Sequence, residues 1–364
     1  VNSPCSSLVD LFFPINILNH KTIIKKIEEL EIIPTVAVSF ISDVGMRPAG
    51  IINDHFKTGG MSEELAIKLT NKKLQREAWD ALGVFNPKWV SVKSLSFLEV
   101  ENLARKFTNH KVVTKPIDSS GSRGIFKINK LSINDKHLLE EALEFSIEGE
   151  IIIEEYIEGR EFSIESFWNN GHCEILAISE RTIVHDKSAF TIISAILPYE
   201  IEMIISDAVI KANQALGVQF GLTHTELILN KKNKPFLIET AGRGGGFYVF
   251  DELVKKVTGI DYSKIYIQQL MKNGTSKNLI NQKNLVAIKY LPSRLGVVKS
   301  ISGFIEANKI EGVKAECFVQ TGDSTKSFVS DADRIGYILV WSDSKQELDE
   351  LLIKTNSLIK IYYY

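Results

Sequence analysis

The sequence has few cysteines, no long apolar run and no excess of charge of either sign. Its three cysteines, Cys5, Cys173 and Cys317, are odd in number and far apart, which fits neither a disulfide framework nor a zinc site. No apolar segment approaches the roughly 18 residues of a membrane helix, and the N-terminus lacks the plan of a signal peptide. We therefore expect a cytoplasmic protein that has no membrane partner.

The charges are balanced, with 43 Lys plus Arg against 45 Asp plus Glu. Because no overall bias draws the molecule toward polyanions, we expect no nucleic-acid partner. The chain has 364 residues, of which 44% are hydrophobic. This is enough material for a soluble protein with a real core and two or three subdomains.

The first part of the chain predicts an α/β arrangement. Two short apolar runs, "LVDLFF" and "PTVAVSF", flank the helical pattern "NHKTIIKKIEEL" within residues 1–60, which indicates a β-α-β unit. Residues 62–83 then predict one continuous helix that stops at Gly83. We expect a subdomain boundary near that glycine.

The middle of the chain carries clear local signals. Ser96 and Glu99 have the spacing of a helix capping box. The dipeptide Asn170-Gly171 joins "REFSIESFW" to "HCEILAISE", which predicts a tight hairpin. Residues 201–216 predict a helix closed by Gly217. Two strands then flank the turn "NKKNK", and residues from about 286 onward predict further strands and one last helix.

The stretch "KPIDSSGSRGIFKI", residues 115–128, places a glycine-rich loop between two expected strands. Backbone N–H groups can wrap a polyphosphate only where no Cβ stands in the way, and Lys115 could point at the same phosphates. The alternative is a flexible polar hairpin with a surface lysine. The candidate phosphate-binding residues of the loop are Ser119, Ser120, Gly121, Ser122 and Gly124.

The stretch "IIIEEYIEGREFSIE" runs from one strand through a turn into another strand. Such a turn can offer main-chain groups to the edge of an adenine ring, and Glu154 could accept a hydrogen bond from its exocyclic amine. Glu161 lies seven residues later and could accept both hydroxyls of a ribose. The alternative is a solvated acidic edge strand.

Two glutamates lie on the strands that flank "NKKNK", Glu226 on the first and Glu239 on the second. A cross-strand pair of carboxylates repels unless a cation lies between them, and both are the hard oxygen ligands that Mg²⁺ prefers. Arg243 follows among glycines, where its planar fork suits a carboxylate or a phosphoryl group. The alternative is a pair of surface glutamates on strands that are out of register.

Taken in this order, the motifs resemble those of the ATP-grasp superfamily, and the resemblance covers nearly the whole chain. The family pattern has a lysine-led glycine loop, an acidic hinge with a second glutamate seven residues on, and two metal-binding acids followed by an arginine. The segment "NKKLQREAWDALGVFNP" is similar to the family segment whose lysine contacts ATP, and aligning Arg76 with the basic residue of that segment selects Lys72. The matching residues here are Lys115 with "SSGSRG", Glu154, Tyr156, Ile157, Glu161, Glu226, Glu239 and Arg243.

One position departs from the family pattern. Ala241 stands where many members have an asparagine that binds metal, so a second Mg²⁺ would take that ligand from water or substrate. Amino acid ligases of the bacilysin type also accept a small residue there and have a similar "THTE", here residues 223–226. His224 in that motif faces the same side of its strand as Glu226. It could lie near the substrate, or it could be a packed, hydrogen-bonded histidine.

The resemblance implies an α+β (α/β) fold, the ATP-grasp fold, with a partial N-terminal pre-ATP-grasp α/β domain and a C-terminal antiparallel lobe. We expect the N-terminal domain at residues 1–70, and we expect it to be incomplete because its opening strand and glycine turn are not evident. The small lobe would comprise residues 71–155 and the large lobe residues 156–364. The antiparallel subdomain, 286–364, would complete the acceptor pocket.

The resemblance further implies an ATP-dependent carboxylate-amine ligase that forms an acyl phosphate and releases ADP and phosphate. Its cofactors would be ATP and one or two Mg²⁺, with Mn²⁺ as an alternative ion. Its substrates would be a small-molecule carboxylate and an amine. As in similar enzymes, it could form a homodimer. Lys72 and Lys115 would hold phosphates, Glu226 and Glu239 the metal, and Arg243 the acyl phosphate.

Two other functions fit the same motifs. One is a bicarbonate-using carboxylase or carbamoyl-phosphate synthase-like enzyme, and the other is a non-catalytic ATP-binding module, which the alanine at position 241 motivates. Residues 181–190, "RTIVHDKSAF", are a candidate substrate loop in which Arg181, His185 and Lys187 could meet an anion; ordinary surface charges are the alternative.

Overall fold

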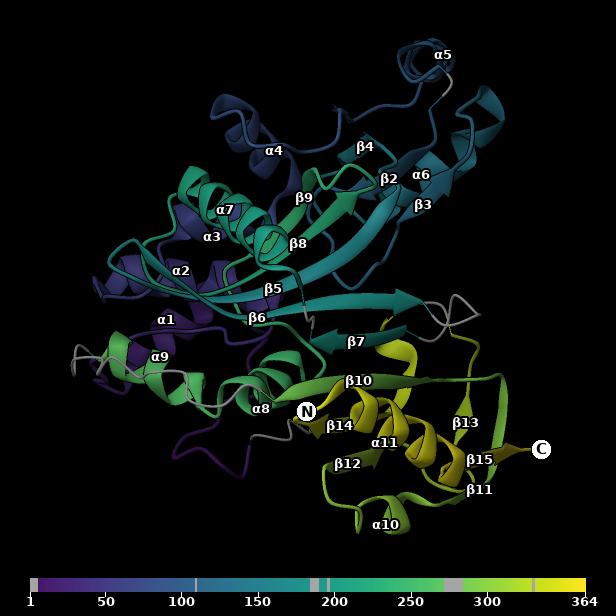
Figure 1. The fold of residues 1–364 in the computed structure, drawn as a ribbon. Helices are drawn as coiled ribbons and strands as arrows, with labels where there is room; N and C mark the ends of the chain where they lie inside the picture. The colour runs from purple at the N-terminus through teal and green to yellow at the C-terminus, as the bar shows by residue number, and fades with distance from the viewer. Residues whose placement is uncertain (1–5, 109, 184–189, 195–196, 272–283, 329–330) are drawn as a thin grey trace.

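The computed structural model describes residues 6–108, 110–183, 190–194, 197–271, 284–328 and 331–364. Three antiparallel sheets organise this part of the chain (Figure 1). Within it, no helix is both long enough and apolar enough to cross a bilayer. The domain boundaries expected near residues 70, 155 and 286 remain predictions.

A four-stranded sheet in the order β1-β4-β2-β3 forms a small layer at one end of the molecule. Its two central strands are mostly buried and contain β-branched runs such as "III" at 151–153, and they share one core with two helices. The helix α5 begins with the predicted capping box of Ser96 and Glu99, which is confirmed. The elements are β1 Trp89–Val92, β2 Val112–Pro116, β3 Phe126–Ile128, β4 Ile151–Glu155, α5 Phe97–Lys106, the 3₁₀ turn η1 Ile133–Asp135 and α6 Lys136–Glu144.

An eight-stranded sheet in the order β12-β14-β10-β7-β6-β5-β8-β9 forms the centre. Asn170 and Gly171, with φ of 51° and 74°, make the tight turn between β5 and β6, so the predicted hairpin is confirmed. The strands are β5 Gly159–Asn169, β6 His172–Ile183, β7 Phe190–Ser194, β8 Gly221–Asn230, β9 Pro235–Ala241, β10 Leu285–Pro292, β12 Val313–Cys317 and β14 Arg334–Ser342.

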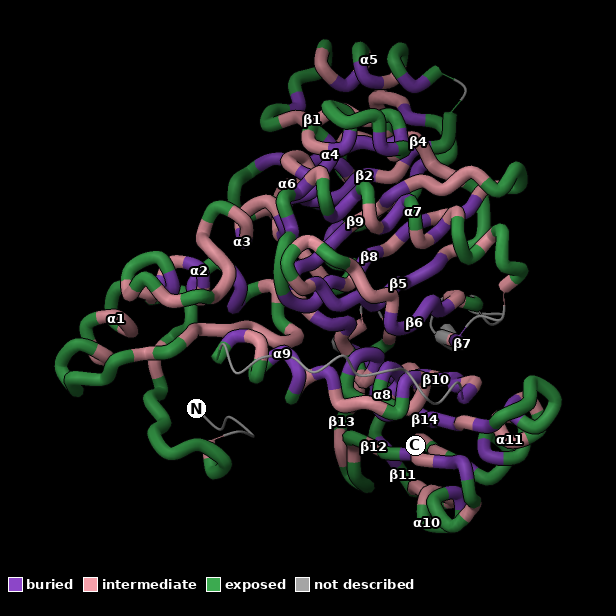
Figure 2. Tube along the Cα trace, turned by 60° about the vertical axis from the view of Figure 1, so that its left-hand side comes forward, coloured by how far each residue is buried: buried purple, intermediate pink, exposed green. Residues whose placement is uncertain are grey.

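The two faces of this sheet support two different cores. Phe167 and Trp168 are neighbours on β5, yet they belong to opposite clusters because successive side chains of a strand alternate. The helix α7 covers the Trp168 face, and Figure 2 shows the strands beneath it as buried. The other face packs against the elements that follow β9. These are the π-helix η2 Val249–Val254, α8 Lys255–Thr258 and α9 Tyr262–Leu270. The helix on the Trp168 face, α7, spans Tyr199–Leu216.

The C-terminal residues add a small sheet in the order β13-β11-β15 and two helices. The helix α11 packs on β14 and β10, and its residue Leu348 is buried in a fourth core. The predicted last helix is therefore confirmed. The elements are β11 Gly296–Ser302, α10 Phe304–Ala307, β13 Ser324–Thr325, the 3₁₀ turn η3 Asp331–Asp333, α11 Lys345–Leu358 and β15 Lys360–Tyr363.

The N-terminal prediction of a β-α-β unit is wrong for the described residues. The runs "LVDLFF" and "PTVAVSF" form no strand, and Figure 2 shows a largely exposed chain over the first of them. The helix α1, His20–Glu29, is present as expected. A second helix, α2 Asp43–Phe56, was not foreseen, because Gly45, Pro48 and Gly50 disguise it.

The single helix predicted over residues 62–83 is also wrong. It is two helices, α3 Glu63–Thr70 and α4 Lys72–Ala81. Asn71 has an extended conformation, and its side chain accepts a hydrogen bond from the Leu74 N–H, so it caps the second helix. The break allows Lys72 to begin a new helix in a new direction.

Candidate active site

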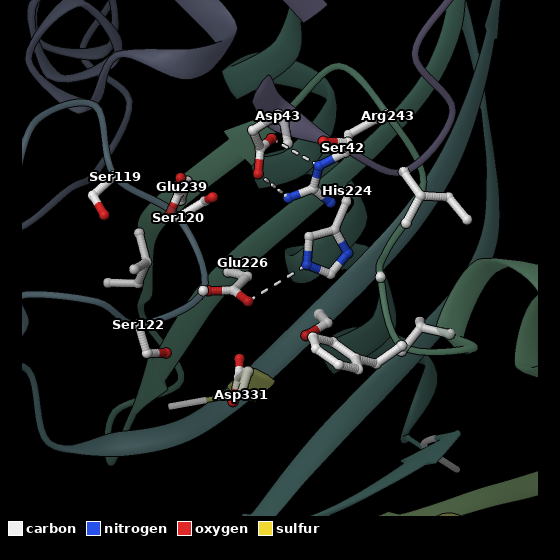
Figure 3. A pocket seen from close by; sticks show the side chains of 18 of the residues that line it. Ser42, Asp43, Ser119, Ser120, Ser122, His224, Glu226, Glu239, Arg243 and Asp331 are labelled. Atoms are coloured by element: carbon white, nitrogen blue, oxygen red, sulfur yellow. Dashed lines mark hydrogen bonds and ion pairs between the residues drawn. The ribbon is translucent and has the colours of Figure 1, made fainter. Parts of the chain in front are cut away.

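A cavity of about 360 Å³ lies where the glycine-rich loop, the β8–β9 pair and the C-terminal part of the chain meet (Figure 3). It brings together most of the residues that the sequence singled out. Those in its wall are Lys72, Lys115, Ser119, Ser120, Gly121, Ser122, Glu226, Glu239 and Arg243. The predicted convergence of a bare loop and two strand-borne glutamates is therefore present in the structure.

The two glutamates are direct partners across adjacent strands. Glu226 of β8 is in register with Glu239 of β9, and on its other side it opposes Ser163 of β5, which also lines the cavity. The neighbouring positions of β8 point to the other face, where Thr225 bonds to Asn213 of α7 at 3.1 Å. The alternation of the strand thus directs both carboxylates into the cavity.

Lys72 reaches the cavity from the start of α4. Its Nζ donates to the Ser119 carbonyl at 2.7 Å and lies 3.1 Å from Glu239 Oε1, and the residue is only 3% exposed. Gln75 holds this helix against β9, because its amide both donates to the Thr240 carbonyl at 2.7 Å and accepts from the Thr240 N–H at 3.0 Å. The ammonium therefore connects the loop to one of the two carboxylates.

Glu154 is buried between two cations. Its carboxylate lies 2.6 Å from Arg76 Nη2 and 2.7 Å from Lys115 Nζ, and its side chain is 2% exposed. Burial disfavours its charge, but Arg76 and Lys115 outweigh that cost and hold the pKa of the carboxyl below its usual range. Glu154 is not in the cavity wall. Its predicted contact with an adenine amine stays a prediction, and its observed role is to orient Lys115.

The hinge residues lie between the two larger sheets. Tyr156 and Ile157 connect β4 to β5, and Lys127 Nζ lies 3.6 Å from the centre of the tyrosine ring. Glu161 is on the same face of β5 as Ser163, with its carboxylate 4.0 Å from the Arg181 guanidinium. None of these three hinge residues is in the cavity wall, nor is Gly124, so their nucleotide contacts stay predictions.

Gly124 has a structural role. Its φ is +69°, and a Cβ there would stand 2.9 Å from side-chain carbons of Phe145 and of Pro116. The loop can turn so close to β2 only because this residue has no side chain.

His224 lies between two carboxylates. Its Nδ1 bonds to Glu165, a residue that is 1% exposed, and its Nε2 lies 3.4 Å from Glu226. Burial opposes its charge, but Glu165 and then Glu226 outweigh burial and raise the pKa of His224 to about 10. Burial likewise opposes the charge of Glu226, but His224, Arg181 and Lys115 lower its pKa to about 2. The imidazolium holds Glu226 ionised.

Arg243 is positioned by Asp43, the first residue of α2. Its Nε and Nη2 donate to the two oxygens of that carboxylate at 2.7 and 2.6 Å, and its Nη1 donates to the Gly244 carbonyl at 2.9 Å (Figure 3). A bidentate ion pair of this kind fixes the plane of the guanidinium. Sequence reasoning could not find Asp43, because it lies 200 residues away and in no motif.

Other residues of the cavity wall were also missed or only partly foreseen. Arg181 was singled out as part of a candidate loop, and it does line the cavity; His185 and Lys187 lie outside the described residues. No motif marked Ser163 on β5. The residues from the C-terminal part of the chain, likewise unmarked, are Tyr290, Asp331 and Arg334.

The donor set fits a hard divalent cation that is shared with a ligand. Two carboxylates face each other in register, and among the described residues no group of three or more His, Cys, Asp or Glu forms a complete metal cage. A Mg²⁺ held by Glu226 and Glu239 would therefore take its remaining ligands from phosphate and water, as Mg²⁺ commonly does. Ala241, which is 3% exposed, adds no ligand.

Two family models match the chain in separate segments. The model of the ATP-grasp domain matches residues 108–251, and the model of the L-amino acid ligase C-terminal domain 2 matches residues 289–364. The first segment contains the loop, the hinge and the glutamate pair. The second contains Tyr290, Asp331 and Arg334.

Among curated proteins, the chain is similar to the alanine–anticapsin ligase of Bacillus subtilis (strain 168). The two are 26% identical over 261 residues, which cover 64% of this chain and 53% of the relative. The chain thus spans about half the length of the curated relative that it matches.

Among solved structures, the chain resembles the L-amino acid ligase from Bacillus licheniformis, with a TM-score of 0.77 and 20% identity over 95% of this chain and 84% of that one. It also resembles the biotin carboxylase domain of the 2-oxoglutarate carboxylase from Hydrogenobacter thermophilus, with a TM-score of 0.74 and 15% identity over 98% and 82%. At these identities the likeness shows the fold alone. The predicted α+β ATP-grasp fold is confirmed.

Proposed function

Because residues 108–251 match the model of the ATP-grasp domain and the chain has the ATP-grasp fold, we propose that it is an ATP-dependent ligase that joins a carboxylate to an amine. The carboxylate oxygen attacks the γ-phosphorus of ATP, and ADP leaves. The amine nitrogen then attacks the acyl carbon, the acyl–oxygen bond breaks, phosphate leaves with the electron pair, and the nitrogen loses a proton. An amide, ADP and phosphate are the products.

The observation that carries this proposal is the register of Glu226 and Glu239, side by side in a cavity that the glycine-rich loop also lines. Phosphoryl transfer asks mainly for positioning and charge neutralisation. A Mg²⁺ held by Glu226 and Glu239 would supply positive charge that offsets the negative charge of the phosphates. The proposal includes one or two Mg²⁺ ions, for which Mn²⁺ could substitute.

The chain's own cations complete the phosphate site. Lys72 and Lys115 are 3% and 7% exposed and both line the cavity, so their charges act where water screens them little. Each is held in place by a carboxylate, Glu239 for the first and Glu154 for the second. Arg243, fixed by Asp43, would steady the acyl phosphate.

The loop itself would exclude water from the intermediate. Gly121 and Ser122, with φ of 68° and 62°, line the cavity, and Asp118 accepts from the Ile147 and Glu148 N–H groups at the base of the loop. A loop tied at its base and bare at its tip can close over phosphates. Closure would protect the acyl phosphate from hydrolysis.

The amino acid ligases are favoured over the carboxylases by the C-terminal segment. Residues 289–364 match a domain of L-amino acid ligases, and this segment contributes to the cavity wall beside the glutamate pair. We therefore propose that an amino acid is among the substrates. A homodimer, as in similar enzymes, remains a prediction.

The test is ADP release in the presence of Mg²⁺ and ATP, measured with a panel of amino acids, alone and in pairs. We expect release to rise with amino acids and a new amide to appear in the mass spectrum. Stimulation by bicarbonate without an amine would assign the chain to the carboxylases instead. ADP release that stays at background with every addition would favour a non-catalytic ATP-binding module.

A further inference from the structure

The lysine that begins α4 is bonded to two protein oxygens, although the proposed function assigns it to phosphates. The Lys72 Nζ donates to the Ser119 carbonyl at 2.7 Å and lies 3.1 Å from Glu239 Oε1. Figure 3 shows Ser119 of the glycine-rich loop next to Glu239 of β9. One ammonium therefore connects the loop to one of the two carboxylates that are expected to hold Mg²⁺.

The two carboxylates of the pair have different cations beside them. Glu226 lies 3.4 Å from His224 Nε2, and the other ring nitrogen of that histidine bonds to the buried Glu165. The imidazole is thus held from both sides. The cation beside Glu239 is Lys72, whose other partner is a neutral carbonyl. Because a lysine has a flexible four-carbon stem, this ammonium is the one of the two cations that can exchange partners.

The helix that carries this lysine is fixed, so an exchange of partners needs only the side chain to move. The Lys72 N–H donates to the Ile117 carbonyl at 2.7 Å. Three residues later, the Gln75 amide bonds to the carbonyl and the N–H of Thr240 on β9, at 2.7 and 3.0 Å. The backbone of Lys72 therefore keeps its position while its ammonium can reach different oxygens in the cavity.

The ammonium and a metal ion compete for Glu239. Mg²⁺ takes carboxylate oxygens as ligands, and the ammonium uses a lone pair of one of these oxygens. Lys72 is 3% exposed, so its charge is weakly screened and repels a cation held by the glutamate pair. A metal ion without a nucleotide must therefore displace the lysine or bind beside a like charge.

A nucleotide offers the ammonium another charged partner. Lys72 shares the cavity wall with Lys115 and with loop residues 120–122, which are predicted to surround phosphates. Phosphate oxygens accept strong, charge-assisted hydrogen bonds from an ammonium. When the ammonium turns to a phosphate, Glu239 Oε1 becomes available to Mg²⁺, and the Ser119 carbonyl loses its charged donor.

We propose that Lys72 couples the binding of the nucleotide to the binding of the metal. Glu239 holds the ammonium in the protein alone, and the phosphates take it when the nucleotide binds. The protein then binds Mg²⁺ weakly by itself and strongly together with a nucleotide, and the loop is released from Lys72 in the same step. This inference rests on the proposed ATP and Mg²⁺ site, and it does not depend on which acid and amine are joined.

Binding measurements without turnover test this coupling. The affinity for Mn²⁺ alone is obtained from the electron paramagnetic resonance signal of the free ion, and the affinity for ADP from calorimetry in EDTA and in Mn²⁺. We compare the wild type with Lys72→Met, and with Lys73→Met as the matched control. Lys73 is the next residue of α4, pairs with Glu150 at 2.8 Å and is outside the cavity wall.

We expect Lys72→Met to change the affinities for metal and nucleotide in opposite directions. Mn²⁺ alone should bind about 10-fold more tightly, because a like charge is removed and Glu239 is free. ADP should bind more weakly. Because the coupling between two ligands is reciprocal, its loss of affinity in Mn²⁺ should exceed its loss in EDTA by the same factor of about 10. Lys73→Met should change no value by more than about twofold.

The link to the loop has its own readout. Arg123 is exposed in the loop, and trypsin cleaves the bond that follows an arginine. In the protein alone, trypsin should cleave Lys72→Met at this bond about 5-fold faster than the wild type, because the Ser119 carbonyl has lost its charged donor. Lys73→Met should be cleaved at the wild-type rate. Equal rates in all three proteins would contradict the release of the loop.

Unchanged or weaker binding of Mn²⁺ alone by Lys72→Met would overturn the inference and leave the proposed function intact, since the lysine would then be a phosphate ligand or a structural residue. If Lys72→Met does not fold, Lys72→Gln decides, because it can still donate to the Ser119 carbonyl but carries no charge. It should also bind Mn²⁺ alone more tightly than the wild type. A wild type that binds Mn²⁺ neither alone nor with ADP would instead remove the metal and nucleotide site, and with it the proposed function.

Discussion

Glu239→Gln is expected to lower Mg²⁺-dependent ADP release about 100-fold or more. The substitution keeps the shape of the side chain but removes its negative charge. That charge lies 3.1 Å from Lys72 Nζ, on the residue in register with Glu226. A neutral amide is a weak ligand for Mg²⁺, and the lysine beside it loses its orienting partner. The measurement is the initial rate of ADP release as a function of Mg²⁺ concentration.

The control is Glu306→Gln, which makes the same chemical change at an exposed position of α10. It should leave the rate within about twofold, as expected for a surface substitution. Because Glu226 remains, high Mg²⁺ should restore part of the Glu239→Gln rate. A rate equal to that of the wild type at every Mg²⁺ concentration would refute the assignment of this pair to the metal.

Arg76→Met is expected to produce the largest loss of stability of any single change near the site. Arg76 is fully buried, and its guanidinium bonds to Glu154 and to the Ile238 carbonyl at 2.6 Å. Methionine fills similar space but leaves the buried Glu154 with Lys115 as its remaining cation. We expect the free energy of unfolding to fall by ~3 kcal/mol, the range for breaking a buried ion pair, measured by urea denaturation.

Two comparisons isolate the cause. Glu154→Gln in the Arg76→Met background should recover part of the loss, because no uncompensated charge then remains. Arg160→Met breaks the Arg160–Glu180 pair, which is half exposed, and should cost less than about 1 kcal/mol. If Arg76→Met and Arg160→Met had equal effects, the buried pair would not be a main support of the site.

The parts of the fold that sequence reasoning predicted correctly depend on local chemistry. The Asn170-Gly171 turn and the Ser96–Glu99 cap each need only residues within a few positions of one another. The pairing of Glu226 with Glu239 follows from a short hairpin, in which the turn fixes the register of the strands. These local sequence signals predict the same turn or cap regardless of the tertiary contacts made by the rest of the chain.

The errors arose where tertiary contacts decide. Asn71 interrupts a pattern that reads as one helix, because the Lys72 N–H bonds to the Ile117 carbonyl at 2.7 Å and the new helix docks on β9. The apolar runs near the N-terminus have the composition of strands but no partner strand among the described residues. Apolar composition alone does not separate a strand from an irregular segment.

Only the part of the site that lies in sequence motifs was predictable. The glycine-rich loop and the glutamate pair lie in motifs, and the structure brings them to one cavity. Asp43, Tyr290 and Arg334 come from distant segments and act through ring stacking and ion pairing, which leave no spacing in the sequence. The part of the cavity wall that these residues form became visible only in three dimensions.

The central claim is that this cavity activates a carboxylate by phosphoryl transfer. Transfer of ¹⁸O tests it most directly: the chain is incubated with Mg²⁺, ATP and amino acids labelled with ¹⁸O in their carboxylates, and the released phosphate is weighed by mass spectrometry. We predict phosphate that carries one ¹⁸O for each amide formed. Phosphate released without the label, its fourth oxygen coming from water, would contradict the account.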